Sequence, residues 1–195
     1  MKINSKKNDP RVNRTHNLIQ DAFLSLASEK DFEAITVKDI ADRAIINRAT
    51  FYAHFEDKYA LLDNLISETF TSLVSDKIKP EAELTEETLK ELILIMCDYN
   101  DTVKSHCKQV YRSASSLFDS KIQLKLHTIV KNLLKNKVTN TKVDEKKIDT
   151  YAIMISGSIY FATNQCHKEV KSNNNSELVS QILPFILAGI ETVYV

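Results

Sequence analysis

Glycine and proline are scarce in this chain of 195 residues, which has only two glycines and three prolines. Good helix formers such as Leu, Lys, Glu and Ala abound instead, so we predict an all-α fold. Rossmann and P-loop enzymes need glycines where the backbone meets phosphate, and Gly157 and Gly189 both lie within apolar helical patterns. The scarcity of glycine therefore argues against a nucleotide-binding enzyme.

Cysteine and long apolar runs are scarce as well. Cys97, Cys107 and Cys166 form no CxxC pair, their number is odd, and no signal peptide precedes them. This pattern favours the reducing cytosol, so we expect a cytoplasmic location. Even the apolar run 152–162 is shorter than the roughly 20 residues that span a bilayer, and it includes Ser156. We therefore expect no membrane partner.

The chain has no net charge, because 26 Lys and Arg residues balance 26 Asp and Glu residues. Any affinity for nucleic acid must therefore come from a local patch. One basic run near the N-terminus is opposed only by Asp9, and it comprises Lys2, Lys6, Lys7, Arg11 and Arg14. The run fits a basic arm that leads into the first helix and a solvated tail equally well.

Apolar residues at helical spacing predict where the helices lie. The predicted segments are 11–28, 37–44, 48–54, a longer helix from 58 that weakens near 79, 85–108, one or two helices across 111–138, 144–170 and 175–194. A proline disfavours helix at the residue before it, so we place a domain boundary near Lys79-Pro80. We expect a three-helix N-terminal domain at 11–72 and a helical C-terminal domain at 80–195.

Residues 36–58 have the pattern of a helix-turn-helix, in which two short helices joined by a tight turn place one helix in a major groove. Thr36 and Asn47 stand where N-caps are needed. In the second helix, a rotation of about 100° per residue puts Phe51 and Phe55 on one inward side.

The outward side of that second helix has the chemistry of a surface that reads bases. Small residues leave room for base edges, and polar residues flank them; together they are Ala49, Thr50, Ala53, Arg48, Tyr52 and His54. Lys58, Thr36 and Lys38 lie near helix starts, where a phosphate is favoured. Considered alone, Tyr52 and His54 also fit ordinary surface residues.

This segment resembles the signature of TetR/AcrR regulators, above all in the run Thr50-Phe51-Tyr52-Ala53-His54-Phe55-Glu56-Asp57-Lys58. The resemblance covers residues 11–70; the rest of the chain is similar only in length and helical character. It implies a transcriptional regulator without enzymatic activity or cofactor, usually a repressor, that binds a near-palindromic operator as a homodimer. It also implies base or groove contacts from Arg48, Ala49, Thr50, Tyr52 and Ala53, and phosphate contacts from Thr36, Lys38, Tyr52, His54 and Lys58.

One position departs from the family pattern. Where the family often has a glycine in the turn, this chain has Ile45. A β-branched residue does not readily adopt a left-handed backbone conformation, so we expect the turn to differ here.

The two predicted C-terminal helices are apolar around much of their circumference. The residues concerned are Ile153, Ile155, Ile159, Phe161, Ala162, Ile182, Leu183, Phe185, Ile186, Leu187 and Ile190. Such a pair is either deeply buried or half of a four-helix bundle between subunits, and we favour a homodimer through these helices.

The resemblance further implies a small-molecule effector pocket in the C-terminal helices. Candidate wall residues are Tyr99, His106, Tyr111, Phe118, Tyr151 and Tyr160, although ordinary core packing also explains each aromatic. A thiol- or metal-responsive regulator is an alternative, because His106-Cys107 and Cys166-His167 each pair a thiol with an imidazole. A co-activator of the same fold with no effector is another. We assign no metal ligands and no catalytic residues.

Overall fold

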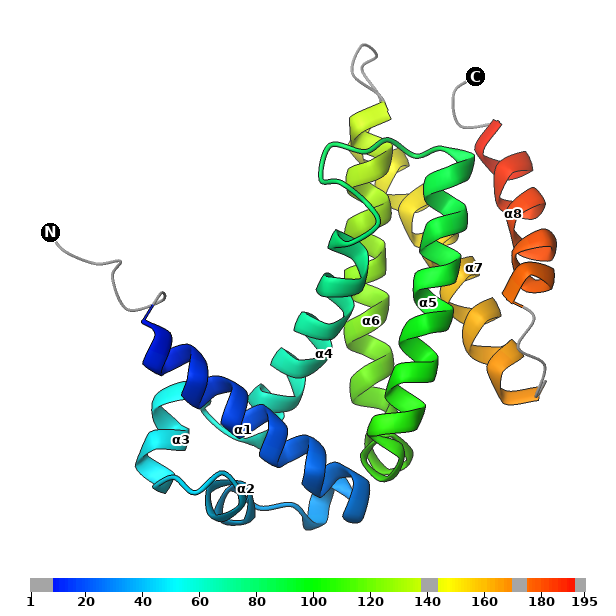
Figure 1. The fold of residues 1–195 in the computed structure, drawn as a ribbon. Coiled ribbons are helices and arrows are strands. Elements are labelled where there is room, and N and C mark those ends of the chain that lie inside the picture. Colours follow the sequence, from blue (N-terminus) through cyan, green and yellow to red (C-terminus); the bar gives the residue numbers. More distant parts are fainter. Residues whose placement is uncertain (1–8, 138–143, 170–174, 192–195) are drawn as a thin grey trace, which may run out of the picture. The chain divides into compact units, whose positions relative to one another are not determined.

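The structure is a computed structural model that describes residues 9–137, 144–169 and 175–191. Regular structure in these ranges is entirely helical, which confirms the predicted all-α fold (Figure 1). In chain order the elements are α1 (Pro10–Glu29), a 3₁₀ turn η1 (Phe32–Ala34), α2 (Val37–Arg43), α3 (Arg48–His54), α4 (Lys58–Ser75), α5 (Glu86–His106), α6 (Lys108–Lys137), α7 (Glu145–Glu169) and α8 (Asn175–Glu191).

The first helices begin where polar side chains cap them. The Asp9 side chain accepts a hydrogen bond from Arg11 N at 2.9 Å, and Pro10 occupies the first turn. Asp57 Oδ1 accepts from Ala60 N at 2.7 Å at the start of α4. Of the basic N-terminal run, Lys2, Lys6 and Lys7 lie outside the described residues.

The chain forms two compact units, and the domain division near 72–80 stays a prediction. The first unit extends to Ile66 and also contains Val103–Phe118, and the second contains Ser67–Thr102 and the residues from Asp119 onward. The boundary therefore falls inside α4, because this helix continues through it without a break. Residues 103–118 join the first unit, where Phe32 N donates a 2.9 Å hydrogen bond to Ser113 Oγ.

Aromatic and aliphatic side chains fill the core of the first unit. Ile19 and Phe23 of α1 are fully buried, and Phe23 meets Phe32 of η1 edge-on at a centroid distance of 6.3 Å. Phe51 of α3 and Leu61 of α4 are also fully buried. This core holds the two short helices α2 and α3 in place, because neither has enough turns to be stable alone.

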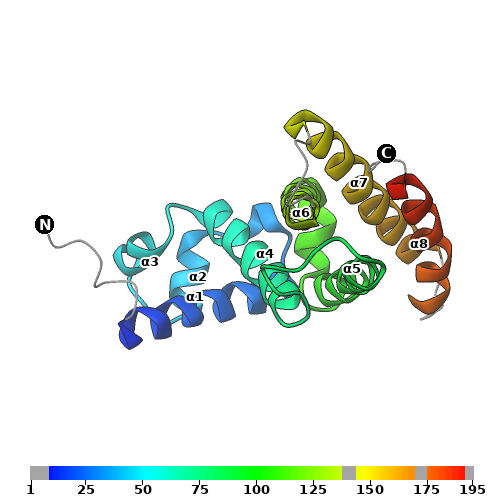
Figure 2. The same cartoon turned by 90° about the horizontal axis from the view of Figure 1, so that it is seen from above.

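In the second unit, α7 and α8 lie side by side (Figures 1 and 2). Ion pairs join α6 to α7: Lys131 Nζ lies 2.5 Å from Asp149 Oδ1, and Lys135 Nζ lies 2.6 Å from Glu145 Oε1. The prediction of one or two helices across 111–138 corresponds to a single run, α6, with non-helical angles at Ala114. No helix in the described part of the chain is long and apolar enough to cross a membrane.

Candidate DNA-binding site

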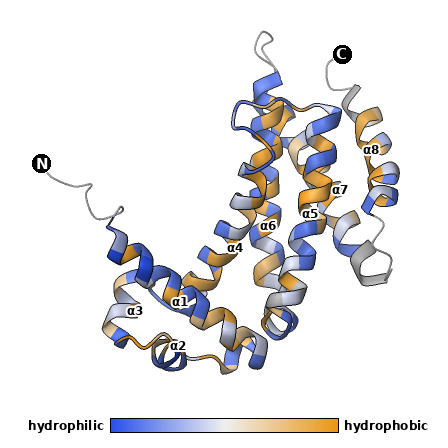
Figure 3. Ribbon diagram, in the orientation of Figure 1, coloured by the Kyte–Doolittle hydropathy of each residue, from blue (hydrophilic) through white to orange (hydrophobic). Residues whose placement is uncertain are grey.

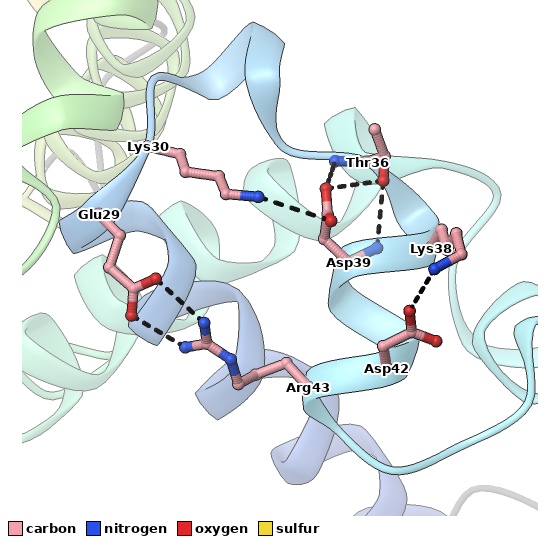
Figure 4. Close-up of polar contacts among 7 residues, drawn as sticks. All are labelled: Glu29, Lys30, Thr36, Lys38, Asp39, Asp42 and Arg43. Atoms are coloured by element: carbon pink, nitrogen blue, oxygen red, sulfur yellow. Dashed lines mark hydrogen bonds and ion pairs between the residues drawn. The ribbon is translucent and has the colours of Figure 1, made fainter.

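A reciprocal capping box starts α2, as the position of Thr36 predicted. Asp39 N donates to Thr36 Oγ1 at 3.1 Å, and Thr36 N donates to Asp39 Oδ2 at 3.0 Å (Figure 4). The Thr36 hydroxyl and backbone bonds hold the pKa of the Asp39 carboxyl below its usual range. Asp39 is therefore ionised at neutral pH, and its negative charge stabilises the N-terminus of α2.

A bidentate ion pair fastens α2 to α1. Both terminal guanidinium nitrogens of Arg43 lie 3.0 Å from the Glu29 carboxylate (Figure 4). Arg43 also contacts the hydroxyl of Ser25. Hydrogen bonding to Arg43 lowers the pKa of Glu29. No sequence pattern marks this pair, because the two residues lie 14 positions apart on different helices and belong to no motif.

The turn between α2 and α3 corrects one expectation. Ile45 does adopt the left-handed conformation, with φ of 55°, although a β-branched residue is ill suited to it. The reason is the way α2 ends: Ile45 N donates to Asp42 O at 3.2 Å and Ile46 N donates to Ala41 O at 3.0 Å. These two bonds form a Schellman motif, which requires a left-handed residue at this position.

Helix α3 has the two faces that the spacing predicted. Asn47 caps it by accepting from Ala49 N at 2.9 Å, and Phe51 and Phe55 are buried against the core. The opposite face is exposed, with Tyr52 at 56%. Arg48, Ala49 and Ala53 are exposed on α3 as well, whereas Thr50 and His54 are half-buried.

His54 packs beside a second histidine. Its ring centroid lies 6.2 Å from that of His16 on α1, and the His16 ring in turn lies 4.9 Å from that of Phe55. Burial, and then the charge of His16, lowers the pKa of His54 below 6.5. At neutral pH His54 is therefore mostly uncharged, so it can offer a phosphate a hydrogen bond rather than a full positive charge.

Lys58 is bonded within the protein. Its Nζ donates to Phe32 O at 2.9 Å and to Glu33 O at 3.3 Å, and lies 4.6 Å from the centre of the Phe32 ring. The side chain is only 14% exposed. Lys58 thus closes the 3₁₀ turn onto α4, an arrangement that competes with the phosphate contact implied by the resemblance.

Lys38 and Thr36, which were also expected at phosphates, have partners on α2. Lys38 Nζ lies 2.7 Å from Asp42 Oδ2 in an exposed pair, which a phosphate can displace because such pairs contribute little stability. The Thr36 hydroxyl donates to Asp39 Oδ2 at 2.8 Å. Both donors of Thr36, its hydroxyl and its backbone N–H, are therefore already hydrogen-bonded to Asp39.

Comparison with known proteins identifies this helix-turn-helix. Residues 19–65 match the family model described as "Bacterial regulatory proteins, tetR family". The match lies within the N-terminal part of the chain and includes α2 and α3. It is 38% identical over 87 residues to the HTH-type transcriptional regulator YxbF of Bacillus subtilis (strain 168), a match that covers 44% of this chain and 23% of YxbF. The chain therefore spans about a quarter of that relative's length.

Solved structures resemble this chain over most of its length. The dihydroxyacetone kinase operon activator DhaS superposes with a TM-score of 0.61 at 19% identity, covering 91% of this chain and 97% of DhaS. FadR from Bacillus subtilis, in complex with stearoyl-CoA, superposes with a TM-score of 0.55 at 18% identity, covering 89% and 98%. At such identities the likeness establishes the fold alone.

The six aromatic and histidine residues expected to line an effector pocket fall in both units of the chain. Tyr99, Tyr151 and Tyr160 belong to the second unit, and His106, Tyr111 and Phe118 to the first. Tyr99 is buried edge-on against Phe70, Tyr111 is paired edge-on with Phe118, and Tyr151 is half-buried. Burial raises the pKa of Tyr160, which accepts a 3.0 Å bond from Asn164. These contacts are those of core residues.

The cysteines offer little support for a thiol sensor. Burial raises the pKa of the Cys107 thiol to about 11, so it stays protonated at neutral pH, whereas reactive cysteines have a lowered pKa. Among the described residues, no group of three or more His, Cys, Asp or Glu could hold a metal ion. The side chains of His106 and Cys166 lie outside what the structure describes.

Proposed function

We propose that this chain is a DNA-binding transcriptional regulator that reads a near-palindromic operator as a homodimer. The observation that carries this proposal is the exposed face of α3, where small side chains stand beside Arg48 and Tyr52. Capping bonds and the Arg43–Glu29 pair fix this face on the buried core. A rigid helix with small residues and flanking donors suits the major groove.

A homodimer through α7 and α8 is supported by apolar side chains that this protomer leaves uncovered. Phe161 is 65% exposed and Phe185 is 74% exposed, and Ile153 and Met154 are exposed beside Phe161 on α7. An added Cβ at Gly157 or Gly189 would meet no atom within 4 Å. Glycine weakens a helix by about 1 kcal/mol. The close approach of a partner helix would account for a glycine at each of these two positions. Figure 3 shows how hydrophobic α8 is.

We further propose that the protein acts in the cytoplasm, represses transcription by occluding a promoter, and is released by a small-molecule effector. The stearoyl-CoA complex of the structurally similar FadR supports a ligand-responsive C-terminal region. The structurally similar DhaS is an operon activator, which keeps activation as the alternative. Deleting the gene should raise transcription of its neighbours, and a fall in their transcription would favour activation.

The test of DNA binding compares the wild-type chain with Arg48→Ala and Tyr52→Ala on the DNA upstream of its own gene, across a salt series. We expect each substitution to weaken specific binding by about 1–3 kcal/mol, because each removes a side chain from the reading face. Lys90→Ala, a change of an exposed residue on α5 outside this face, is the matched control. Equal affinity of all four proteins would refute the assignment of α3 as the reading helix.

A further inference from the structure

The second half of α4 and the middle of α6 run beside each other, and hydrogen bonds join α6 both to α4 and to the segment that follows α4. Lys125 Nζ of α6 donates to Thr71 Oγ1 of α4 at 3.3 Å. Further along, Asn136 Nδ2 donates to Pro80 O at 3.0 Å and to Ala82 O at 2.8 Å. All of these contacts lie within the second unit.

A groove of about 490 Å³ is lined by residues of α4, of the segment that follows α4, and of α6. This volume falls within the range of pockets that hold small molecules. Phe70, Val74, Ile129 and Leu133 form much of its apolar wall, and Leu124 is 62% exposed beside them. An exposed leucine on a groove that is already apolar indicates a surface able to cover a hydrocarbon chain.

The charged residues among the described lining of this groove are all lysines. Lys121 and Lys125 stand at the end near Ser67 and Thr71, and Lys79 stands at the other end. No aspartate or glutamate is among the residues that line it. The chain as a whole has equal numbers of acidic and basic residues, so this local excess of lysine is not a consequence of composition.

We propose that the groove binds a single-chain amphiphile with an anionic head group, as a free monomer and not as part of a membrane. The head group is held by Lys121 and Lys125 with the Thr71 hydroxyl, and the chain lies along Val74 and Leu124. Hydrogen bonds from a charged donor to a charged acceptor are the strong ones, and the apolar wall supplies the burial. The proposed DNA binding is not needed for this inference, because the groove lies within the second unit.

Calorimetric titration of the full chain with laurate, below the concentration at which it forms micelles, tests the site. We expect wild-type protein to bind laurate and dodecyl phosphate, and the Lys121→Gln/Lys125→Gln variant to bind each about ten-fold more weakly. Lys90→Gln/Lys146→Gln is the matched control, since both lysines are exposed in the same unit and neither lines the groove. Dodecyltrimethylammonium, with the same chain and a cationic head, should not bind.

Two further measurements separate the competing explanations. Val74→Trp narrows the groove and should abolish binding while circular dichroism stays that of a folded helical protein. Vesicles of phosphatidylglycerol should bind no better to wild type than to the double lysine variant. Absence of laurate binding to wild type, equal binding by the two lysine variants, or a preference for vesicles would each overturn the proposal. None of these results depends on whether the chain binds DNA.

Discussion

Ile45 holds a backbone conformation that suits glycine better than a β-branched residue. Its φ is 55° and its side chain is 91% exposed, so packing offsets little of the strain. The left-handed conformation costs an L-residue roughly 1–2 kcal/mol, and glycine avoids this cost but loses about 0.5–1 kcal/mol through its freer unfolded chain. We expect Ile45→Gly to raise the free energy of unfolding by roughly 0.5–1 kcal/mol, measured by urea denaturation.

The neighbouring residue provides the control for this prediction. Ala44 has right-handed angles of φ −78° and ψ −6° and is buried. Ala44→Gly should therefore lower the free energy of unfolding by about 1 kcal/mol, because it adds freedom to the unfolded chain without relieving strain. If both glycine variants lose stability to a similar extent, Ile45 is not strained.

Side-chain facing on α3 was predictable from the sequence, whereas the partners of individual polar groups were not. A fixed rotation per residue determines that Phe51 points inward when Ala49 and Ala53 point outward. The contact of Lys58 with Phe32 O joins residues 26 positions apart, and it depends on a 3₁₀ turn that no sequence pattern marks. The conformation of Ile45 likewise follows from the hydrogen bonds at the end of α2.

The junction between η1 and α4 depends on the ammonium of Lys58, whose side chain is 14% exposed. Replacing it by Met keeps the aliphatic stem but removes the charged donor from Phe32 O and Glu33 O and the cation from the Phe32 ring. We expect Lys58→Met to lower the free energy of unfolding by about 1–3 kcal/mol in urea denaturation. Lys38→Met, at an exposed residue of α2, should change it by less than about 0.5 kcal/mol.

The salt dependence of DNA binding by Lys58→Met separates the structural role of Lys58 from a phosphate contact. If Lys58 only bonds to η1, Lys58→Met leaves unchanged the slope of log DNA affinity against log salt concentration, because no contact that releases a counterion is lost. A lysine that contacts phosphate would lower that slope by about 1 when removed. A lowered slope with unchanged stability would contradict the bracing role of Lys58.

Helix starts were the most predictable elements, since Thr36, Asn47 and Asp57 are caps that act within three residues of themselves. The groove between α4 and α6 was not predictable. Lys121 and Lys125 occur at i and i+4, which in a sequence is the pattern of an ordinary solvated helix face. Only the packing of α6 against α4 gives these two lysines a shared apolar neighbour.

At the scale of the whole chain, sequence patterns indicate where helices end but not which distant segments pack together. Prolines and breaks in periodicity indicate where helices end, so the boundary was expected near Lys79-Pro80. The first unit also contains residues 103–118, which approach η1 through the Phe32–Ser113 hydrogen bond across 81 positions. Contacts at that separation leave no local pattern.

The uncovered face of α7 and α8 leads to a prediction about assembly. Phe161→Asp places a charge where the proposed homodimer buries an aromatic ring, so we expect the chain to sediment as a monomer in analytical ultracentrifugation at concentrations where wild type is a dimer. Leu124→Asp is the matched control, because Leu124 is similarly exposed but lies on α6. Its sedimentation should be that of wild type. A dimer of Phe161→Asp as stable as wild type would place the subunit interface elsewhere.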